Sequence, residues 1–203
     1  MIRLGVLASG RGSNLQAIIN AIDKGDVDAV ISMVISNRPD ARALPRASVR
    51  GIPARLIVEE DYPSRLEHNL HMADVLREYA VDLVVLAGYD RILNPAFLQA
   101  FPMKVMNIHP SLLPAFAGGL DAQQDALNYG VKVTGCTVHF VTEEVDGGPI
   151  ILQKAVPVLD EDNVDTLSLR ILEEEHRLFP RAIQLFATGR LRVEGRRVLG
   201  TSE

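Results

Sequence analysis

Three polar residues in the second half of the chain have side chains suited to attack on a carbonyl-level carbon. Asn107 and His109 stand two positions apart in the apolar run 104–109, and Asp146 lies downstream in a turn with two glycines. Side chains at positions i and i+2 of a strand point to the same face, so the amide and the imidazole can reach one reacting group. An amide donor, a titratable imidazole and a carboxylate together supply oxyanion stabilisation and acid–base catalysis.

The glycine-rich segment 10–14 predicts a second site at the start of the first helix. It separates the apolar run 4–8 from an amphipathic helical pattern that begins at Leu15. Glycines let the backbone approach an anion, and a helix N-terminus offers free N–H groups. A dinucleotide-binding fingerprint would need glycine at Leu15 and an acid near 36–38, and a Walker motif would need Gly-Lys-Ser or Gly-Lys-Thr. A site for one phosphate group remains, with an ordinary strand-to-helix turn as the alternative.

The elements around these residues alternate between apolar strands and helices. Apolar runs separated by helices indicate a parallel sheet covered on both faces. The sequence therefore predicts an α/β, Rossmann-like, doubly wound fold with a mostly parallel sheet, and residues 1–203 form one domain because no linker interrupts them. His68 and His71, on a polar helix, are expected to be exposed. Strands are expected at 4–8, 29–35, 54–58, 82–87, 104–109, 133–141 and 150–158, helices from Leu15 and at 41–50, 64–79, 95–100, 120–129 and 164–187, and a small hairpin at 192–198.

The bulk composition is that of a soluble globular protein, with 47% hydrophobic and 23% charged residues. A net charge of −5 argues against a general nucleic-acid or membrane-binding surface. The single cysteine, Cys136, excludes an intrachain disulfide and fits a reducing compartment. It is predicted to be a buried strand residue rather than a nucleophile. The lack of a signal peptide and of a membrane-length apolar run predicts a cytoplasmic protein.

Four motifs give the chain a family resemblance that spans nearly its whole length. They are 9–18 (SGRGSNLQAI), 86–93 (LAGYDRIL), 107–114 (NIHPSLLP) and 139–149 (HFVTEEVDGGP). With these motifs the chain resembles the phosphoribosylglycinamide formyltransferases, the folate-dependent transferases of purine biosynthesis. The resemblance implies the formyltransferase fold, transfer of a formyl group from 10-formyltetrahydrofolate to the amine of glycinamide ribonucleotide, and no metal.

The resemblance also implies roles for individual residues. Asn107, His109 and Asp146 would be catalytic. The substrate's phosphate would be held by Gly12, Ser13 and Asn14, and its ribose hydroxyls would be bound by Glu175. The folate would contact Arg65, Asp90, Arg91, Ile92, Leu93, Asn107, Thr142, Glu143, Glu144, Val145 and Asp146.

In the implied reaction, the substrate amine attacks the formyl carbon and forms a tetrahedral oxyanion. Asn107 would donate a hydrogen bond to this oxygen, a contact worth roughly 3–4 kcal/mol in barrier height. His109 would stabilise the oxyanion as imidazolium and move a proton toward the departing folate nitrogen, and Asp146 would favour the charged imidazole. The chain departs from the family pattern at Asp90, where methionine is usual and an acid makes the pocket more acidic. It also departs at 116–120, to which we assign no site residue.

Other functions fit parts of this pattern. A 10-formyltetrahydrofolate hydrolase and methionyl-tRNA formyltransferase share the Asn–His–Asp chemistry, but they usually carry a further regulatory or RNA-binding domain. A nicotinamide-dependent reductase, with Arg38 near a cofactor phosphate, and a noncatalytic nucleotide-binding module are alternatives of other classes. His109, His139 and Asp146 could instead form a two-histidine, one-carboxylate metal site, although neither histidine belongs to a ligand-spaced motif.

Overall fold

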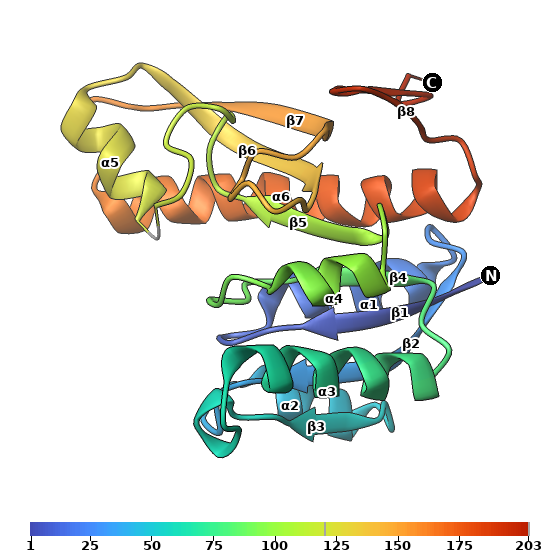
Figure 1. Ribbon diagram of the computed structural model, residues 1–203. Helices are drawn as coiled ribbons and strands as arrows, with labels where there is room; N and C mark the ends of the chain where they lie inside the picture. Colours follow the sequence, from blue (N-terminus) through green and yellow to red (C-terminus); the bar gives the residue numbers. More distant parts are fainter. Residues whose placement is uncertain (120, 203) are drawn as a thin grey trace.

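The computed structural model describes residues 1–119 and 121–202, which form a single sheet with helices on both faces (Figure 1). The described residues contain nine strands in the spatial order β3-β2-β1-β4-β5-β6-β7-β9-β8. Strands β1 to β5 run parallel to one another, whereas β6 is antiparallel to both β5 and β7. The strands are β1 (Ile2–Leu7), β2 (Ala29–Ser36), β3 (Ala54–Leu56), β4 (Leu83–Leu86), β5 (Val105–His109), β6 (Val133–Phe140), β7 (Ile150–Pro157), β8 (Arg192–Glu194) and β9 (Arg197–Leu199).

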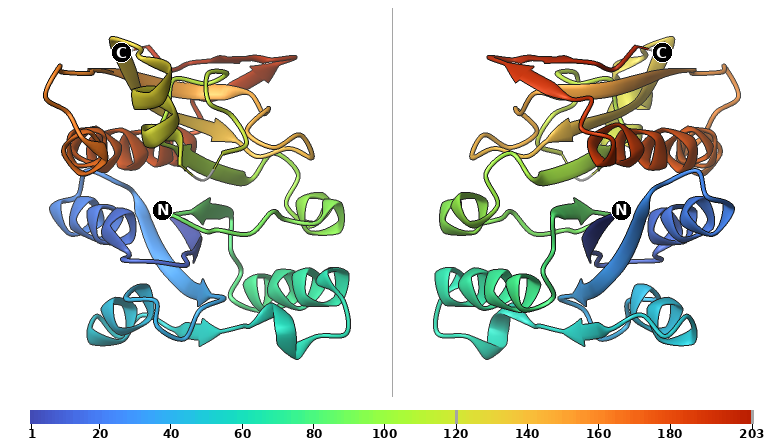
Figure 2. Two further views of the ribbon diagram at one scale, coloured as in Figure 1. Left: turned by 90° about the vertical axis from the view of Figure 1, so that its left-hand side faces the viewer. Right: turned by 90° about the vertical axis from the view of Figure 1, so that its right-hand side faces the viewer.

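Helices cover both faces of this sheet, as the side views in Figure 2 show. Helices α1, α2 and α6 lie on one face, and α3 and α4 lie on the other. This arrangement confirms the predicted doubly wound, mostly parallel fold. The helices are α1 (Ser13–Lys24), α2 (Ala43–Val49), α3 (Arg65–Glu78), α4 (Pro95–Ala100), α5 (Ala122–Tyr129) and α6 (Val164–Ala187), with a 3-10 helix at Glu59–Asp61.

The central parallel strands send alternate side chains into two hydrophobic cores. In β1, Val6 packs into the core beneath α1 and α6, whereas Leu7 belongs to the core beneath α3 and α4. In β4, Val85 and Val84 divide between the two cores in the same way. Because both faces are buried, these strands are apolar at successive positions, which explains the unbroken apolar runs in the sequence.

The strand order reverses between β1 and β4, and this reversal fixes where a ligand crevice opens. In doubly wound sheets, ligands bind outside the carboxyl ends of the strands at such a point. The glycine-rich segment 10–14 follows β1, and the motif around 88–93 follows β4. Parallel β5 ends with His109 at the same edge of the sheet. The glycine-rich segment and the catalytic candidates therefore lie at the same edge of the sheet.

The antiparallel pairing of β5 with β6 brings three polar side chains to one face. Asn107 lies opposite His139 in the register, while Met106 and Ile108 point into the core beneath α1 and α6. Asn107, His109 and His139 therefore share the opposite face, since side chains alternate along each strand and paired residues point the same way.

Of the two histidines expected to be exposed on α3, His71 is exposed and His68 is buried. Burial of His68 is stabilised by a contact of 3.2 Å between its Nε2 and the Ile57 carbonyl oxygen, and its ring packs edge-on against Tyr62. A polar helix pattern gives no sign of such a contact with a residue 11 positions away. The expectation for His68 was wrong for this reason.

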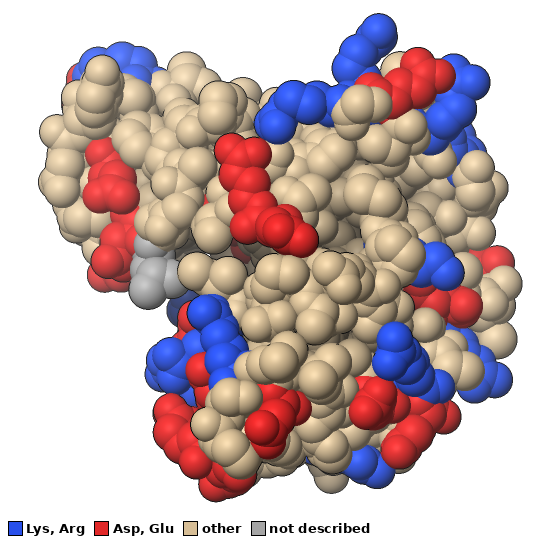
Figure 3. Space-filling model, viewed as in Figure 1, with Lys and Arg blue, Asp and Glu red and all other residues tan. Residues whose placement is uncertain are grey.

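The helix predicted at 120–129 begins at Ala122, and Leu120 lies outside the described residues. No helix formed by the described residues is long and apolar enough to cross a membrane. On the face seen in Figure 3, acidic and basic side chains form small interspersed groups rather than one surface of a single sign. Charge recognition therefore has to be argued locally, from the residues of each pocket.

Candidate active site

Asp146 links the two histidines that the sheet places on one face. Its Oδ2 lies 3.4 Å from Nδ1 of His109, and its Oδ1 lies 3.6 Å from Nε2 of His139. The Nδ2 atom of Asn107 lies 3.2 Å from the same His139 nitrogen. His109 and His139 are buried, and the Asp146 side chain is only 12% exposed. The predicted trio of Asn107, His109 and Asp146 is therefore brought together, and His139 contacts both Asn107 and Asp146.

The contacts of His139 determine how the Asn107 amide is oriented. His139 Nδ1 lies 2.9 Å from the Phe140 carbonyl oxygen, which can only accept, so Nδ1 carries the hydrogen. In the neutral ring, Nε2 then has a lone pair and accepts a hydrogen bond from Asn107 Nδ2. This bond holds the Asn107 amide group and leaves its second N–H free to donate to a ligand.

Both nitrogens of His109 face oxygen acceptors. Nδ1 faces the Asp146 carboxylate, and Nε2 lies 3.1 Å from the Phe116 carbonyl oxygen. Both contacts are hydrogen bonds only when each nitrogen carries a hydrogen, which is the imidazolium form. Phe116, in the segment 116–120 to which we assigned no site residue, thus contacts His109 directly.

Asp146 is held in an unusual backbone conformation beside several donors. Its φ is 52°, a left-handed value that is uncommon outside glycine and that clusters at functional sites. Burial would raise the pKa of its carboxyl group, but the proximity of His139 and a 2.8 Å hydrogen bond from the Gly118 N–H outweigh burial and lower it. Asp146 is therefore a carboxylate at neutral pH.

Gly148 allows the turn that carries Asp146 to close. A Cβ atom at this position would lie 1.7 Å from the Phe140 carbonyl oxygen, a backbone atom that cannot move aside. The Phe140 N–H in turn donates to the Pro149 carbonyl oxygen at 2.9 Å. The glycine is required by this close approach of two backbone segments.

A pocket of about 460 Å³ opens beside these residues. Eight of the eleven residues predicted to contact folate line it, namely Asp90, Arg91, Ile92, Leu93, Asn107, Thr142, Val145 and Asp146. Arg65, Glu143 and Glu144 are not among the lining residues. Arg65 instead donates to the Ile92 carbonyl oxygen at 2.5 Å, so it supports one wall of the pocket from behind.

Asp90 does not make this pocket locally acidic, because its charge is compensated. An Arg38 guanidinium nitrogen lies 2.5 Å from its Oδ2, and Asn37 donates to its Oδ1 at 2.9 Å. Burial would raise the pKa of Asp90, but hydrogen bonds from Asn37 and Ser9 and the charge of Arg38 lower it. The sequence-based expectation of a more acidic pocket was wrong, because the ion pair with Arg38 was not foreseen.

The glycine loop and α6 build a second pocket of about 440 Å³. Asn14 at the start of α1 donates to Glu175 of α6 at 2.8 Å, and both side chains are 7% exposed. Burial raises the pKa of Glu175, and the Asn14 bond offsets only part of this rise. The two pockets share the lining residues Gly88, Ile108 and Pro110, so they adjoin at the carboxyl ends of β4 and β5.

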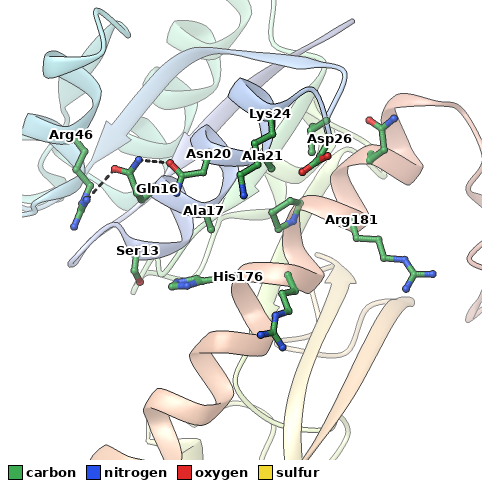
Figure 4. Close-up of a pocket in the computed structure, with 14 residues that line it drawn as sticks. Ser13, Gln16, Ala17, Asn20, Ala21, Lys24, Asp26, Arg46, His176 and Arg181 are labelled. Atoms are coloured by element: carbon green, nitrogen blue, oxygen red, sulfur yellow. Dashed lines mark hydrogen bonds between the residues drawn. The ribbon is translucent and has the colours of Figure 1, made fainter.

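The other two predicted phosphate-binding residues are placed differently. Gly12 is buried and has a φ of 69°, and a Cβ at this position would lie only 3.0 Å from the Ala43 Cα. Ser13 lines a separate groove between α1 and α6, opposite His176 (Figure 4). The loop itself is anchored by Arg46, whose Nε donates to the Arg11 carbonyl oxygen at 3.0 Å.

The sequence grouped His139 with His109 and Asp146 only as an alternative metal site, and it gave no indication of the contacts that Phe116 and Gly118 make with the trio. The alternation of β6 offered one signal, because it places His139 and Thr137 on the face opposite the apolar residues. Cys136 is buried in β6 as predicted, and burial raises the pKa of its thiol to about 12. No cluster of three or more potential metal ligands exists among the residues described. The expected lack of a metal stays a prediction.

Comparisons with known proteins bear directly on this site. Residues 2–183 match the formyl transferase family. The phosphoribosylglycinamide formyltransferase of Haemophilus influenzae is 46% identical over 194 residues, which are 96% of this chain and 91% of the relative. Glycinamide ribonucleotide transformylase 1 from Symbiobacterium toebii has a TM-score of 0.96 and 56% identity, covering 98% of this chain and 93% of its own. A formyltetrahydrofolate deformylase from Pseudomonas syringae has a TM-score of 0.89 but only 28% identity, covering 98% of this chain and 65% of its own. The chain belongs to the phosphoribosylglycinamide formyltransferase family of transferases.

Proposed function

We propose that the protein transfers the formyl group of 10-formyltetrahydrofolate to the amine of glycinamide ribonucleotide. The observation that carries this proposal is the pair of adjoining pockets, which meet beside Asn107 and His109 and share Gly88, Ile108 and Pro110. One pocket is lined by Arg11 and Asn14 of the glycine-rich segment, and the other is lined by eight of the eleven residues predicted to contact folate. Holding both reactants in adjoining pockets makes the transfer effectively unimolecular.

The catalytic step follows from the contacts of the trio. The substrate amine attacks the formyl carbon, and the carbonyl electrons move onto oxygen to give a tetrahedral oxyanion. The free N–H of Asn107 donates to this oxygen, and the His109 imidazolium adds a positive charge. As the electrons of the oxyanion re-form the carbonyl, the bond between the formyl carbon and the folate nitrogen breaks. His109 donates a proton to that leaving nitrogen and takes up the proton lost by the attacking amine. Asp146 stabilises the charged imidazole at a distance of 3.4 Å.

Binding of each substrate is assigned to one pocket. The first-turn N–H groups of α1 and segment 12–14 hold the phosphate of the ribonucleotide, and Glu175 accepts hydrogen bonds from its ribose hydroxyls. The folate occupies the pocket between 90–93 and 142–146, where Arg65 acts by supporting the Ile92 carbonyl oxygen. We further propose that 1–203 acts as one formyltransferase domain, a view supported by the continuous sheet. The cytoplasmic location stays a prediction.

The test is an assay for release of tetrahydrofolate from 10-formyltetrahydrofolate, with and without glycinamide ribonucleotide. We expect release to depend on the amine and to match the amount of formylated product. The competing function is the deformylase activity of the more distant relative, in which water replaces the amine. Release at the same rate without the ribonucleotide, with formate as product, would establish that alternative and exclude the transferase.

A further inference from the structure

Arg11 lines the pocket that contains Asn14 and Glu175, and no described residue pairs with its guanidinium. The residues that line this pocket include two acids, Asp165 and Glu175, and Arg11 is the one basic residue among those described there. Within the described part of the chain, its guanidinium has no hydrogen bond or ion pair. Its backbone carbonyl, by contrast, accepts from Arg46 at 3.0 Å, so the position of its Cα is fixed while its side chain stays available.

Two other polar features of this pocket, the side-chain oxygen of Asn14 and the N-terminus of α1, also have no side-chain partner among the described residues. Asn14 is 7% exposed, and its Oδ1 has no hydrogen-bond partner among the described residues, although its Nδ2 is used by Glu175. The N-cap residue of α1 is Gly12, which has no side chain to cap the helix. A buried amide oxygen requires a donor, and uncapped N–H groups favour an anion. A ligand with both a hydroxyl donor and an anionic group satisfies the two requirements together.

Charge balance assigns the anionic end of that ligand to Arg11. A phosphate monoester brings close to two negative charges to a pocket whose lining includes the buried Glu175 and the exposed Asp165, and like charges so close together disfavour one another. The other arginine of the loop region, Arg46, donates to Gln16 at 3.1 Å and lines the separate groove of Figure 4. Arg11 is therefore the side chain that can neutralise a phosphate here.

We propose that Arg11 binds the phosphate of the phosphorylated amine substrate and sets the preference of this pocket for a phosphate ester. The inference rests on the proposed function for the identity of the amine, but the recognition of phosphate by Arg11 stands apart from it. A guanidinium forms charge-assisted, often bidentate hydrogen bonds with phosphate, whereas lysine presents only a point charge.

The test compares Arg11→Gln and Arg11→Lys with Arg42→Gln, which removes the same charge at the N-terminus of α2, outside the pocket lining. For Arg11→Gln we expect the KM for glycinamide ribonucleotide to rise about 10-fold, with kcat and the KM for the folate unchanged. Arg11→Lys should recover part of the loss, and Arg42→Gln should match the wild type. A KM within twofold of wild type for Arg11→Gln would overturn the proposal.

A second measurement separates phosphate recognition from a structural effect on the loop and from the proposed reaction. Arg11→Gln should not change the KM for the dephosphorylated substrate, glycinamide riboside. Equal losses with both substrates would overturn the proposal. Calorimetric binding of ribose 5-phosphate should weaken about 10-fold in Arg11→Gln, and this readout needs no turnover. If the wild type fails to formylate the ribonucleotide but the calorimetric loss is seen, the proposed function fails and the role of Arg11 stands.

Discussion

Replacement of His139 tests whether this buried histidine controls the Asn107 amide. In the structure, His139 Nε2 accepts from Asn107 Nδ2 at 3.2 Å, and His139 Nδ1 is fixed by the Phe140 carbonyl oxygen. In His139→Ala the Asn107 amide loses its acceptor and can rotate or exchange its oxygen and nitrogen positions. The oxygen would then face the reacting oxyanion for part of the time, which removes the stabilising donor.

The size of the effect follows from the bond that is lost. A net hydrogen bond of this kind contributes about 1 kcal/mol, which corresponds to roughly a fivefold loss in kcat. Complete removal of the oxyanion donor, in Asn107→Ala, should cost about 100-fold to 1,000-fold. If His139 acts through Asn107, the double variant Asn107→Ala/His139→Ala should be no slower than Asn107→Ala alone, because the group to be oriented is already absent.

The assay is single-turnover formyl transfer by the four proteins of this cycle, with unfolding midpoints measured to confirm that each is folded. His139→Gln offers a side-chain oxygen as acceptor and should recover part of the rate. Equal losses from His139→Ala in the wild-type and Asn107→Ala backgrounds would refute the orienting role. The same comparison in an Asp146→Asn background is needed, since His139 Nε2 also lies 3.6 Å from Asp146 Oδ1. A ¹⁵N NMR spectrum that places the hydrogen of His139 on Nε2 rather than on Nδ1 would also refute this orienting role.

Three further predictions concern Asp146, Glu175 and Gly148. Asp146→Asn should lower kcat about 100-fold. Because the folded pKa of Asp146 is lowered, its stabilising effect is present above the pKa of the unfolded chain and is lost as the pH falls, so the wild type and the variant should converge in unfolding free energy at acidic pH. The pKa of Glu175 is raised, so its ionisation opposes folding; Glu175→Gln should gain stability relative to wild type as the pH rises through that pKa, while its KM for the ribonucleotide increases. Equal stability differences at pH 4 and pH 8 would contradict this. Gly148→Ala should lower the unfolding free energy by about 2 kcal/mol or more in a denaturant titration, because its Cβ meets the Phe140 carbonyl oxygen, whereas Gly10→Ala, with open space around it, should have little effect.

The sequence correctly predicted the strands and helices whose burial produces a local pattern of hydrophobic residues. The apolar runs of β1, β4 and β5 and the long amphipathic pattern of α6 report burial directly, and their bounds differ from the expected ones by about two residues or fewer. The face shared by Asn107 and His109 also follows from spacing alone, since alternation along a strand is a local property.

Contacts between residues distant in the chain could not be read in this way. The bond between Asn14 and Glu175 joins positions 161 residues apart, and the ion pair of Arg38 with Asp90 joins two different loops. Nothing in the local pattern around either residue specifies its partner. The left-handed backbone conformation of Asp146 also could not be predicted, because an Asp-Gly-Gly sequence is compatible with several turn types.

The change from parallel to antiparallel pairing at β6 explains why the site forms where it does. If β6 were parallel to β5, a crossover connection would have to join them. The chain would then leave β6 at the carboxyl ends of the parallel strands. Antiparallel β6 instead ends at the opposite edge from His109, beside the start of β5, and places His139 opposite Asn107. The segment 141–149, which follows β6, then folds back over the sheet face that carries Asn107 and His139. The close approach of Gly148 to Phe140 holds this segment in place. Asp146 consequently reaches both histidines from a loop, whereas the histidines themselves are fixed by strand register. On this reasoning, loosening the turn should release Asp146 while leaving the Asn107–His139 pair intact.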